Sequence, residues 1–167
     1  MIDLRQATVN DAAELSRIQV DSWTVFTDIF SPAYMANHNT FEHRFLYWMN
    51  ILTRDIDRTY LIEVDGKSVG YITIGYPRDD DLACDTLELT ALYLKTESIG
   101  KGYGAHVMRR IFSSIKDAGF NRLSLWVLKD NTRAIDFYRH FDFSFDGVDM
   151  TLPIHGAILE TRMSRDL

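Results

Sequence analysis

The sequence has little cysteine and no long apolar run. Cys84 is the single cysteine among 167 residues, so no disulfide can form within the chain, which fits a reducing cytoplasm. It stands in the acidic stretch RDDDLACD, where no adjacent base would stabilise a reactive thiolate. No stretch approaches the roughly 18 apolar residues of a membrane helix, and the opening MIDLRQATVND lacks the apolar core of a signal peptide. We therefore expect a cytoplasmic protein without a membrane partner.

Positive charge is also scarce. Lys and Arg number 18 against 24 Asp and Glu, which gives a formal net charge of −6. This balance argues against nucleic acid as the main partner, although it is compatible with a cationic small molecule. The histidines show no spacing typical of a metal site, so we expect no metal; they are His38, His43, His106, His140 and His155.

The composition is that of a packed globular protein, with 46% hydrophobic and 13% aromatic residues. We expect residues 1–167 to form a single domain. Alternation of apolar residues predicts strands at Ile2–Ala7, Thr59–Val64, Ser68–Gly75, Thr86–Leu94, Leu123–Leu128, Phe143–Val148 and Ala157–Met163. Asp65-Gly66, between the second and the third of these strands, predicts a hairpin turn. Helical spacing predicts helices after Thr8, at Thr40–Leu52, at Lys101–Ala118 and at Thr132–Phe141, with Ser31-Pro32 as a break. The order of these elements predicts a mixed α/β class.

A glycine-rich turn, IGKGYGA at residues 99–105, separates a strand pattern from a helix pattern. Such a turn can direct several backbone N–H groups at a phosphate, and the following helix adds the positive end of its dipole. We therefore expect a phosphorylated cofactor. A helix-entry turn without a ligand is the simpler alternative, but three glycines in five residues exceed what a cap needs.

Two other phosphate-binding motifs fit less well. Gly100, Gly102 and Ala105 match the dinucleotide fingerprint G-x-G-x-x-G/A in form. That fingerprint should follow its strand directly, whereas Lys95–Ser98 intervene here, and no acid stands about 20 residues further on to hold a ribose. A P-loop sequence is absent.

The stretch Leu87–Phe143 resembles the GNAT family, the GCN5-related N-acetyltransferases. Gly102 and Gly104 match the family's [QR]-x-x-G-x-[GA] turn, and a second motif, N-x-x-A-x-x-x-Y, follows after one strand, on Asn131, Ala134 and Tyr138. The chain departs from the pattern at two positions. Ile99 stands where the family usually has Gln or Arg, and Asp142 precedes Phe143 where the family usually has Gly.

The resemblance implies a GNAT fold: an α/β domain whose central mixed, mostly antiparallel and twisted sheet has about six or seven strands. Helices flank this sheet, and its fourth and fifth strands, near Leu89–Leu94 and Leu123–Leu128, splay apart. It implies an enzyme that moves an acetyl group from acetyl-CoA to a primary amine, with no metal.

The resemblance also assigns roles to residues. Backbone N–H groups of the turn would bind the pyrophosphate: Ile99, Gly100, Lys101, Gly102, Tyr103, Gly104 and Ala105. The strand at Leu92, Tyr93 and Leu94 would pair with the pantetheine arm, which Asn131 and Ala134 would also contact. Tyr138 would be the general acid and Glu88 the general base. The alternatives are a core aromatic for Tyr138, a helix cap for Asn131, and a surface or salt-bridged carboxylate for Glu88.

The sequence does not identify the acceptor of the acetyl group. The strand LELTALYL and the acidic loop at Asp79–Asp81 favour a polyamine or another small amine. A protein N-terminus or a lysine is an alternative acceptor. A non-catalytic acyl-CoA-binding or regulatory domain, and a dinucleotide-dependent oxidoreductase, are alternatives of other classes. A homodimer also stays open.

Overall fold

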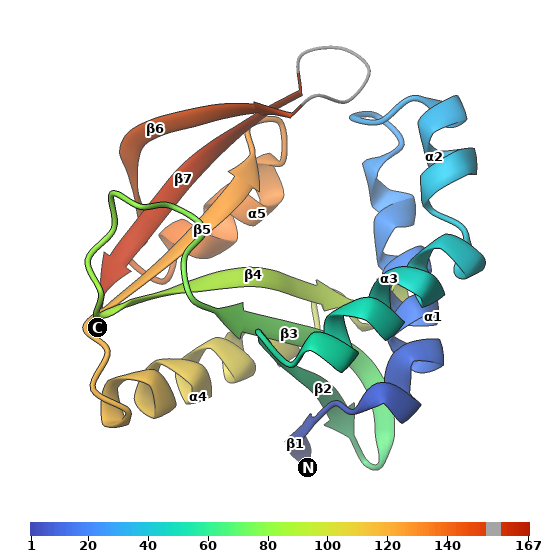
Figure 1. Ribbon diagram of the computed structural model, residues 1–167, viewed down its shortest axis with the longest axis horizontal. Coiled ribbons are helices and arrows are strands. Elements are labelled where there is room, and N and C mark those ends of the chain that lie inside the picture. Colours follow the sequence, from blue (N-terminus) through green and yellow to red (C-terminus); the bar gives the residue numbers. More distant parts are fainter. Residues whose placement is uncertain (153–157) are drawn as a thin grey trace. The chain divides into compact units, whose positions relative to one another are not determined.

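The protein is described by a computed structural model, which covers residues 1–152 and 158–167. Its strands form one sheet in the order β1-β2-β3-β4-β5-β7-β6 (Figure 1). The sheet is mostly antiparallel, with one parallel pair, β4 and β5. The α/β class and a mostly antiparallel sheet of seven strands confirm the prediction. Contacts divide the chain into a first unit, Met1–Gly75 with Ala91–Ile111, and a second unit, Tyr76–Thr90 with Phe112–Leu167.

The first unit contains β1 (Ile2–Gln6), β2 (Arg58–Val64), β3 (Lys67–Gly75) and the end of β4 (Thr86–Leu94). β1 and β2 are antiparallel, as are β2 and β3. Asp65 and Gly66 join β2 to β3 with φ values of 50° and 75°. Both values are positive, as a type I′ hairpin turn requires, so the predicted hairpin is confirmed.

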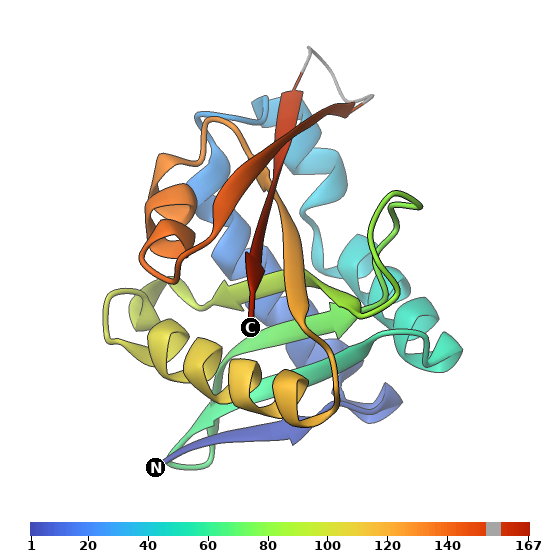
Figure 2. The ribbon, with the colours of Figure 1, turned by 90° about the vertical axis from the view of Figure 1, so that its left-hand side faces the viewer.

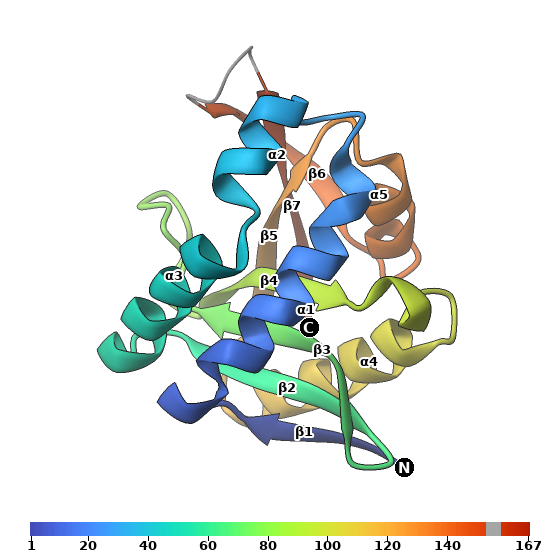
Figure 3. The same ribbon diagram turned by 90° about the vertical axis from the view of Figure 1, so that its right-hand side faces the viewer.

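Helices α1 (Ala12–Trp23) and α3 (Phe41–Arg54) cover one face of β1–β3, and residues 103–111 of α4 (Tyr103–Asp117) lie on the other face (Figures 2 and 3). Two short 3₁₀ turns, Val9–Asp11 and Thr24–Phe26, flank α1. The core between α1, α3 and the strands includes Leu15, Ile18, Trp48, Leu61 and Tyr71. The residues from the helices follow the helical spacing of the sequence, and those from the strands follow its alternation of apolar residues.

Helix α2 (Pro32–His38) was not predicted, because Ser31-Pro32 was interpreted as a break. The structure shows that this pair starts a helix instead. The Ser31 hydroxyl accepts a hydrogen bond from Tyr34 N at 3.2 Å, and Pro32 is the first helical residue, where its missing N–H costs nothing.

The second unit contains the start of β4, β5 (Arg122–Leu128), α5 (Thr132–Arg139), β6 (Ser144–Leu152) and β7 (Ile158–Asp166). β5 runs parallel to β4 over residues 122–125 opposite 86–89, and β7 lies between β5 and β6, antiparallel to both. The opening of the sheet beyond residue 89 and the single domain stay predictions. Ala157, the expected start of the closing strand, and His155 lie outside the described residues.

Candidate functional site

The glycine turn lies between a 3₁₀ turn, Thr96–Ser98, and the start of α4. Gly100 and Gly102 have φ values of 82° and 81°, a region that side chains other than hydrogen rarely tolerate. A Cβ built on either glycine would have no atom of the described residues within 4 Å. The glycines are therefore required by the backbone, and the surface of the turn is open, which fits the approach of a phosphate.

The first amides of α4 are the available donors of this turn. A helix leaves its first N–H groups without an acceptor inside the helix, here those of Tyr103, Gly104 and Ala105, whereas His106 N already bonds to Gly102 O at 3.1 Å. Ile99 differs from the expectation, because its N–H donates to Thr96 O at 3.3 Å. The donors for an anion therefore lie at the helix end of the predicted stretch.

Two contacts anchor the entry to this turn on α1. The carboxylate of Asp21 accepts hydrogen bonds from Thr96 N at 2.6 Å and from Thr96 Oγ1 at 3.2 Å. Lys95 Nζ donates to Glu14 Oε1 at 3.0 Å. These bonds fix where the chain leaves β4, and so they position the start of α4.

The end of β4 carries the residues predicted to follow the pantetheine arm. Leu92, Tyr93 and Leu94 are half-buried. Gly70 on β3 lies directly beside them, since a Cβ there would collide with Tyr93 O and with Leu94. The Tyr93 ring packs among aromatic side chains, with centroids 6.4 Å from Trp23 and 5.6 Å from Tyr71.

In the second unit, α5 carries the other motif. Asn131 caps the helix, and its Oδ1 accepts a hydrogen bond from Ala134 N at 3.1 Å. This is the capping role that the sequence left open, and the carboxamide NH₂ group is still able to donate. The Tyr138 ring is half-buried, with centroids 5.3 Å from Phe137 and 5.7 Å from Phe143.

Asp142 follows α5 with φ of 62°. This is the position at which the family usually has Gly. Asp is one of the few other residues that enter the left-handed region, so the substitution preserves the turn. Phe143 N then bonds back to Tyr138 O at 3.2 Å.

Glu88 is 1% exposed and is held by Arg78 through three hydrogen bonds. Arg78 Nη2 and Nε donate to Oε1 at 2.7 and 3.1 Å, and Arg78 N donates to Oε2 at 3.1 Å. The structure thus shows a salt-bridged carboxylate, the alternative to a free base.

Glu160, on β7, is a second carboxyl group in this environment, and the sequence did not point to it. Burial raises its pKa above the ordinary value, Arg78 acts in the opposite direction, and the charge of Glu88 raises the pKa further. No motif contains Glu160. Its proximity to Glu88 and Arg78 arises only when β7 pairs with β5, opposite Leu128.

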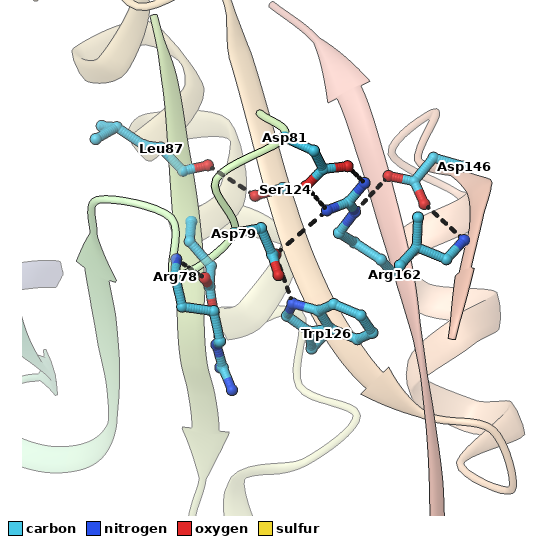
Figure 4. Close-up of polar contacts among 10 residues, drawn as sticks. Arg78, Asp79, Asp81, Leu87, Ser124, Trp126, Asp146 and Arg162 are labelled. Carbon is cyan, nitrogen blue, oxygen red and sulfur yellow. Dashed lines mark hydrogen bonds and ion pairs between the residues drawn. The ribbon is translucent and has the colours of Figure 1, made fainter. Parts of the chain in front are cut away.

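Two aspartates of the acidic loop before β4, Asp79 and Asp81, pair with Arg162, whose side chain is 4% exposed (Figure 4). Arg162 donates to both carboxylate oxygens of Asp81 at 2.7 Å and to Asp146 at 2.6 Å, and it lies 3.4 Å from Asp79. Trp126 Nε1 donates to the same Asp79 oxygen at 2.9 Å. Hydrogen bonding to Arg162 lowers the pKa of Asp81. Two of the loop aspartates expected to attract a cation, Asp79 and Asp81, are therefore already paired with Arg162, which also holds Asp146 on β6.

Cys84 is exposed with a free thiol. Lys101, within the glycine turn, is also exposed. Within residues 1–152 and 158–167, no group of three or more His, Cys, Asp or Glu side chains could hold a metal ion. No helix in the same residues is long and apolar enough to span a membrane.

The order and geometry of these elements agree with a comparison against protein families. Residues 23–143 match the Acetyltransferase (GNAT) family. The chain belongs to the GNAT family. It is an N-acetyltransferase, and acetyl-CoA is its co-substrate. The resemblance seen in the sequence is thereby confirmed, whereas the roles of the individual site residues stay predictions.

Relatives and solved structures support this GNAT assignment. The chain is 26% identical over 145 residues to the N-acetyltransferase YuaI of Bacillus subtilis, covering 84% of this chain and 79% of YuaI. It is also 26% identical over 152 residues to an N-acetyltransferase of Archaeoglobus fulgidus, covering 84% of this chain and 92% of that relative.

The fold is similar to PaiA N-acetyltransferase from Thermoplasma acidophilum, solved in complex with coenzyme A. The TM-score is 0.75 with 18% identity, over 100% of this chain and 99% of PaiA. An acetyltransferase from Thermus thermophilus gives a TM-score of 0.72 with 22% identity, over 100% and 97% of the two chains. At these identities the likeness concerns the fold.

Proposed function

We propose that this GNAT enzyme acetylates a primary amine by direct attack of the amine on the thioester of acetyl-CoA. The observation that carries the proposal is the open turn at Gly100 and Gly102, followed at once by the first amides of α4. This arrangement suits the pyrophosphate of coenzyme A, because the donors and the helix dipole act on the same anion.

Residues of the turn and of β4 would hold the co-substrate. The amides of Tyr103, Gly104 and Ala105 would bind phosphate oxygens, and Lys101 would add positive charge. Backbone groups of Leu92, Tyr93 and Leu94 would pair with the pantetheine arm, and an N–H of this strand would polarise the carbonyl. The carboxamide NH₂ of Asn131 would donate to the same arm while its oxygen caps α5.

Glu88 and Tyr138 would carry out the proton transfers of the reaction. Amines arrive mostly as ammonium ions, so Glu88 would accept one proton, directly or through water, before the nitrogen attacks. The C–N bond forms, the C–S bond breaks, and Tyr138 would give its phenolic proton to the leaving thiolate. The new amide nitrogen loses its second proton, Tyr138 regains one from solvent, and one proton per turnover is released.

The acceptor is proposed as a small molecule with a primary amine. The preference for a polyamine rested in part on the acidic loop, and the pairing of Asp79 and Asp81 with Arg162 weakens this argument. A protein N-terminus or a lysine is the competing acceptor. A cytoplasmic location and a homodimer stay predictions.

Release of free thiol from acetyl-CoA, measured with a panel of amines, polyamines, amino acids and peptides, tests the proposal. We expect acceptor-dependent release with at least one small primary amine. Isothermal titration with acetyl-CoA would run beside it. Tight binding of acetyl-CoA with no thiol release for any small amine would overturn the proposed acceptor class, and release with peptides alone would place the acceptor on a polypeptide.

A further inference from the structure

Arg44, on α3, is a buried cation without a carboxylate partner. It is 8% exposed and makes no ion pair within the described residues. Its Nε donates a long hydrogen bond, 3.4 Å, to Asn39 Oδ1, and its buried Nη2 has no hydrogen-bond partner within residues 1–152 and 158–167. Burial lowers the pKa of Arg44, although nearby tyrosine hydroxyl groups partly oppose the shift. A buried guanidinium is unfavourable unless an anion compensates it.

A second unsatisfied donor belongs to the side chain on which Arg44 is stacked. The Arg44 guanidinium carbon lies 4.1 Å from the Trp23 ring centroid. Trp23 Nε1 is buried and, like Arg44 Nη2, finds no acceptor in the described residues. Buried N–H donors are nearly always paired in native proteins, so two such donors on touching side chains, with no acceptor among residues 1–152 and 158–167, favour a bound acceptor at this place.

The side chains around this pair are aromatic. Trp23 stacks on Phe30 at 5.2 Å, Phe30 stacks on Tyr34 at 5.1 Å, and Tyr34 stacks on His38 at 4.3 Å. These rings come from α1, α2 and the segment that joins them, and they offer planar surfaces. Figure 3 shows the course of these elements. An anion entering this site would meet Arg44 as its partner in an environment of low dielectric constant.

The pair also lies beside the strand on which acetyl transfer is expected. The Trp23 ring centroid is 6.4 Å from that of Tyr93, and Tyr93 stands on β4 between Leu92 and Leu94. All of these residues belong to the first unit. A molecule bound at Arg44 and Trp23 would therefore lie next to the strand assigned to the pantetheine arm, where an acetyl acceptor has to be.

We propose that Arg44 and Trp23 bind the carboxylate of the acetyl acceptor, so that the substrate is an amine that also carries a carboxylate, as an amino acid does. The acceptor role rests on the proposed function. Guanidinium N–H groups suit a planar carboxylate, since both oxygens can be engaged. The indole N–H, as a neutral donor, would donate to one of the same oxygens. Two donors satisfy a carboxylate better than a phosphate, which presents more oxygens and more charge.

Pairs of acceptors that differ only in the carboxylate test the proposal. We would compare phenylalanine with phenethylamine and alanine with ethylamine, and measure kcat/KM from thiol release. The wild type should prefer the carboxylate-bearing member of at least one pair. Arg44→Gln should reduce that preference by at least about 10-fold, mainly through KM, because the charge-assisted hydrogen bonds to the carboxylate are lost. Unchanged preference in Arg44→Gln would overturn the proposal.

Arg17→Gln is the matched control. Arg17 also lies over an aromatic ring, 5.5 Å from the centroid of Phe41, but its side chain is 62% exposed and it has Glu14 as partner at 3.7 Å. Its loss should leave the carboxylate preference unchanged. Arg44→Lys keeps the positive charge but loses the planar pair of N–H donors. It should therefore show a carboxylate preference between that of Arg44→Gln and that of the wild type.

Trp23→Phe keeps an aromatic ring but removes the indole N–H together with the five-membered ring, and it carries the test if Arg44→Gln does not fold. It should weaken the carboxylate preference by a smaller factor. Thermal shift by the same amino acids, without acetyl-CoA, separates binding from turnover. An Arg44-dependent shift without thiol release would refute the role of the amino acids as acetyl acceptors and keep the carboxylate site. A shift produced by a phosphate monoester and not by the amino acids would refute the choice of carboxylate.

Discussion

The guanidinium of Arg78 donates twice to one carboxylate oxygen of Glu88, with Nη2 2.7 Å and Nε 3.1 Å from Oε1, while the backbone N of the same residue lies 3.1 Å from Oε2. This relationship gives Glu88 two competing explanations, a general base or the buried half of an ion pair. The two explanations predict different effects on kcat when Glu88 is replaced by the uncharged residue Gln.

Glu88→Gln should lower kcat at neutral pH by about 10²-fold if Glu88 is the base. Activity should recover in part as the pH rises, because an amine that has lost its proton in solution needs no base. A pH profile of kcat/KM measures this. Arg78→Gln is the companion variant: it removes the ion pair, leaves the carboxylate, and should lower stability by about 1–3 kcal/mol. If Glu88→Gln changes stability but leaves kcat intact at every pH, Glu88 is structural.

Tyr138→Phe should lower kcat by about 10²-fold and leave the KM for acetyl-CoA almost unchanged. The phenolic proton matters mainly in the transition state, whereas the ring contacts with Phe137 and Phe143 persist. Steady-state kinetics, with single-turnover measurements to show that chemistry is rate-limiting, check this. Tyr76→Phe, at an exposed tyrosine of the same unit, is the control and should behave as the wild type. A normal kcat in Tyr138→Phe would assign the proton to another residue or to water.

Gly102→Ala should weaken acetyl-CoA binding and also lower the free energy of unfolding by about 1–2 kcal/mol, because the φ of 81° is unfavourable for alanine. Gly119→Ala separates the two effects. Gly119 has φ of 90° and equally open surroundings, but it lies after α4. Gly119→Ala should lower the free energy of unfolding by a similar amount. The affinity for acetyl-CoA, measured by calorimetry, should not change. Equal loss of affinity in both variants would contradict the role of the turn.

Glu160→Gln should raise the melting temperature at pH 7–8 and have little effect near pH 4. Burial raises the pKa of Glu160 in the folded state, so folding is penalised once the solution pH is high enough to ionise this group. The penalty is absent below the unfolded pKa, where the carboxyl is protonated in both states. Thermal unfolding of both proteins across this range provides the measurement, and a gain that persists undiminished at pH 4 would argue against this cause.

Local patterns predicted much of the fold. The Asp65-Gly66 hairpin, the Thr86–Leu94 strand and the helix after the glycine turn depend on residues near one another in sequence, and all are present. Helix α2 was missed because Pro32 serves equally well as a break and as a first helical residue.

The partners of Glu88 and Asp81 could not be predicted in the same way. Arg162 is 81 residues from Asp81, and Arg78 reaches Glu88 only because the chain turns back before β4. The same holds for Arg44 and Trp23, whose contact depends on the packing of α3 against α1. Charge in the sequence gave the right residue types, but only tertiary structure shows which charges are already paired.

The place of β7 has a consequence for the order in which the second unit forms. β7 follows all other strands in the sequence, yet it lies between β5 and β6 and carries Arg162, the partner of Asp79, Asp81 and Asp146. While the chain emerges from the ribosome, β6 has no strand to join and the acidic loop has no cation to hold it. This half of the protein therefore completes its folding only after synthesis has passed β7, and until then an unpaired edge of β5 and an uncompensated cluster of negative charge are exposed to the cell.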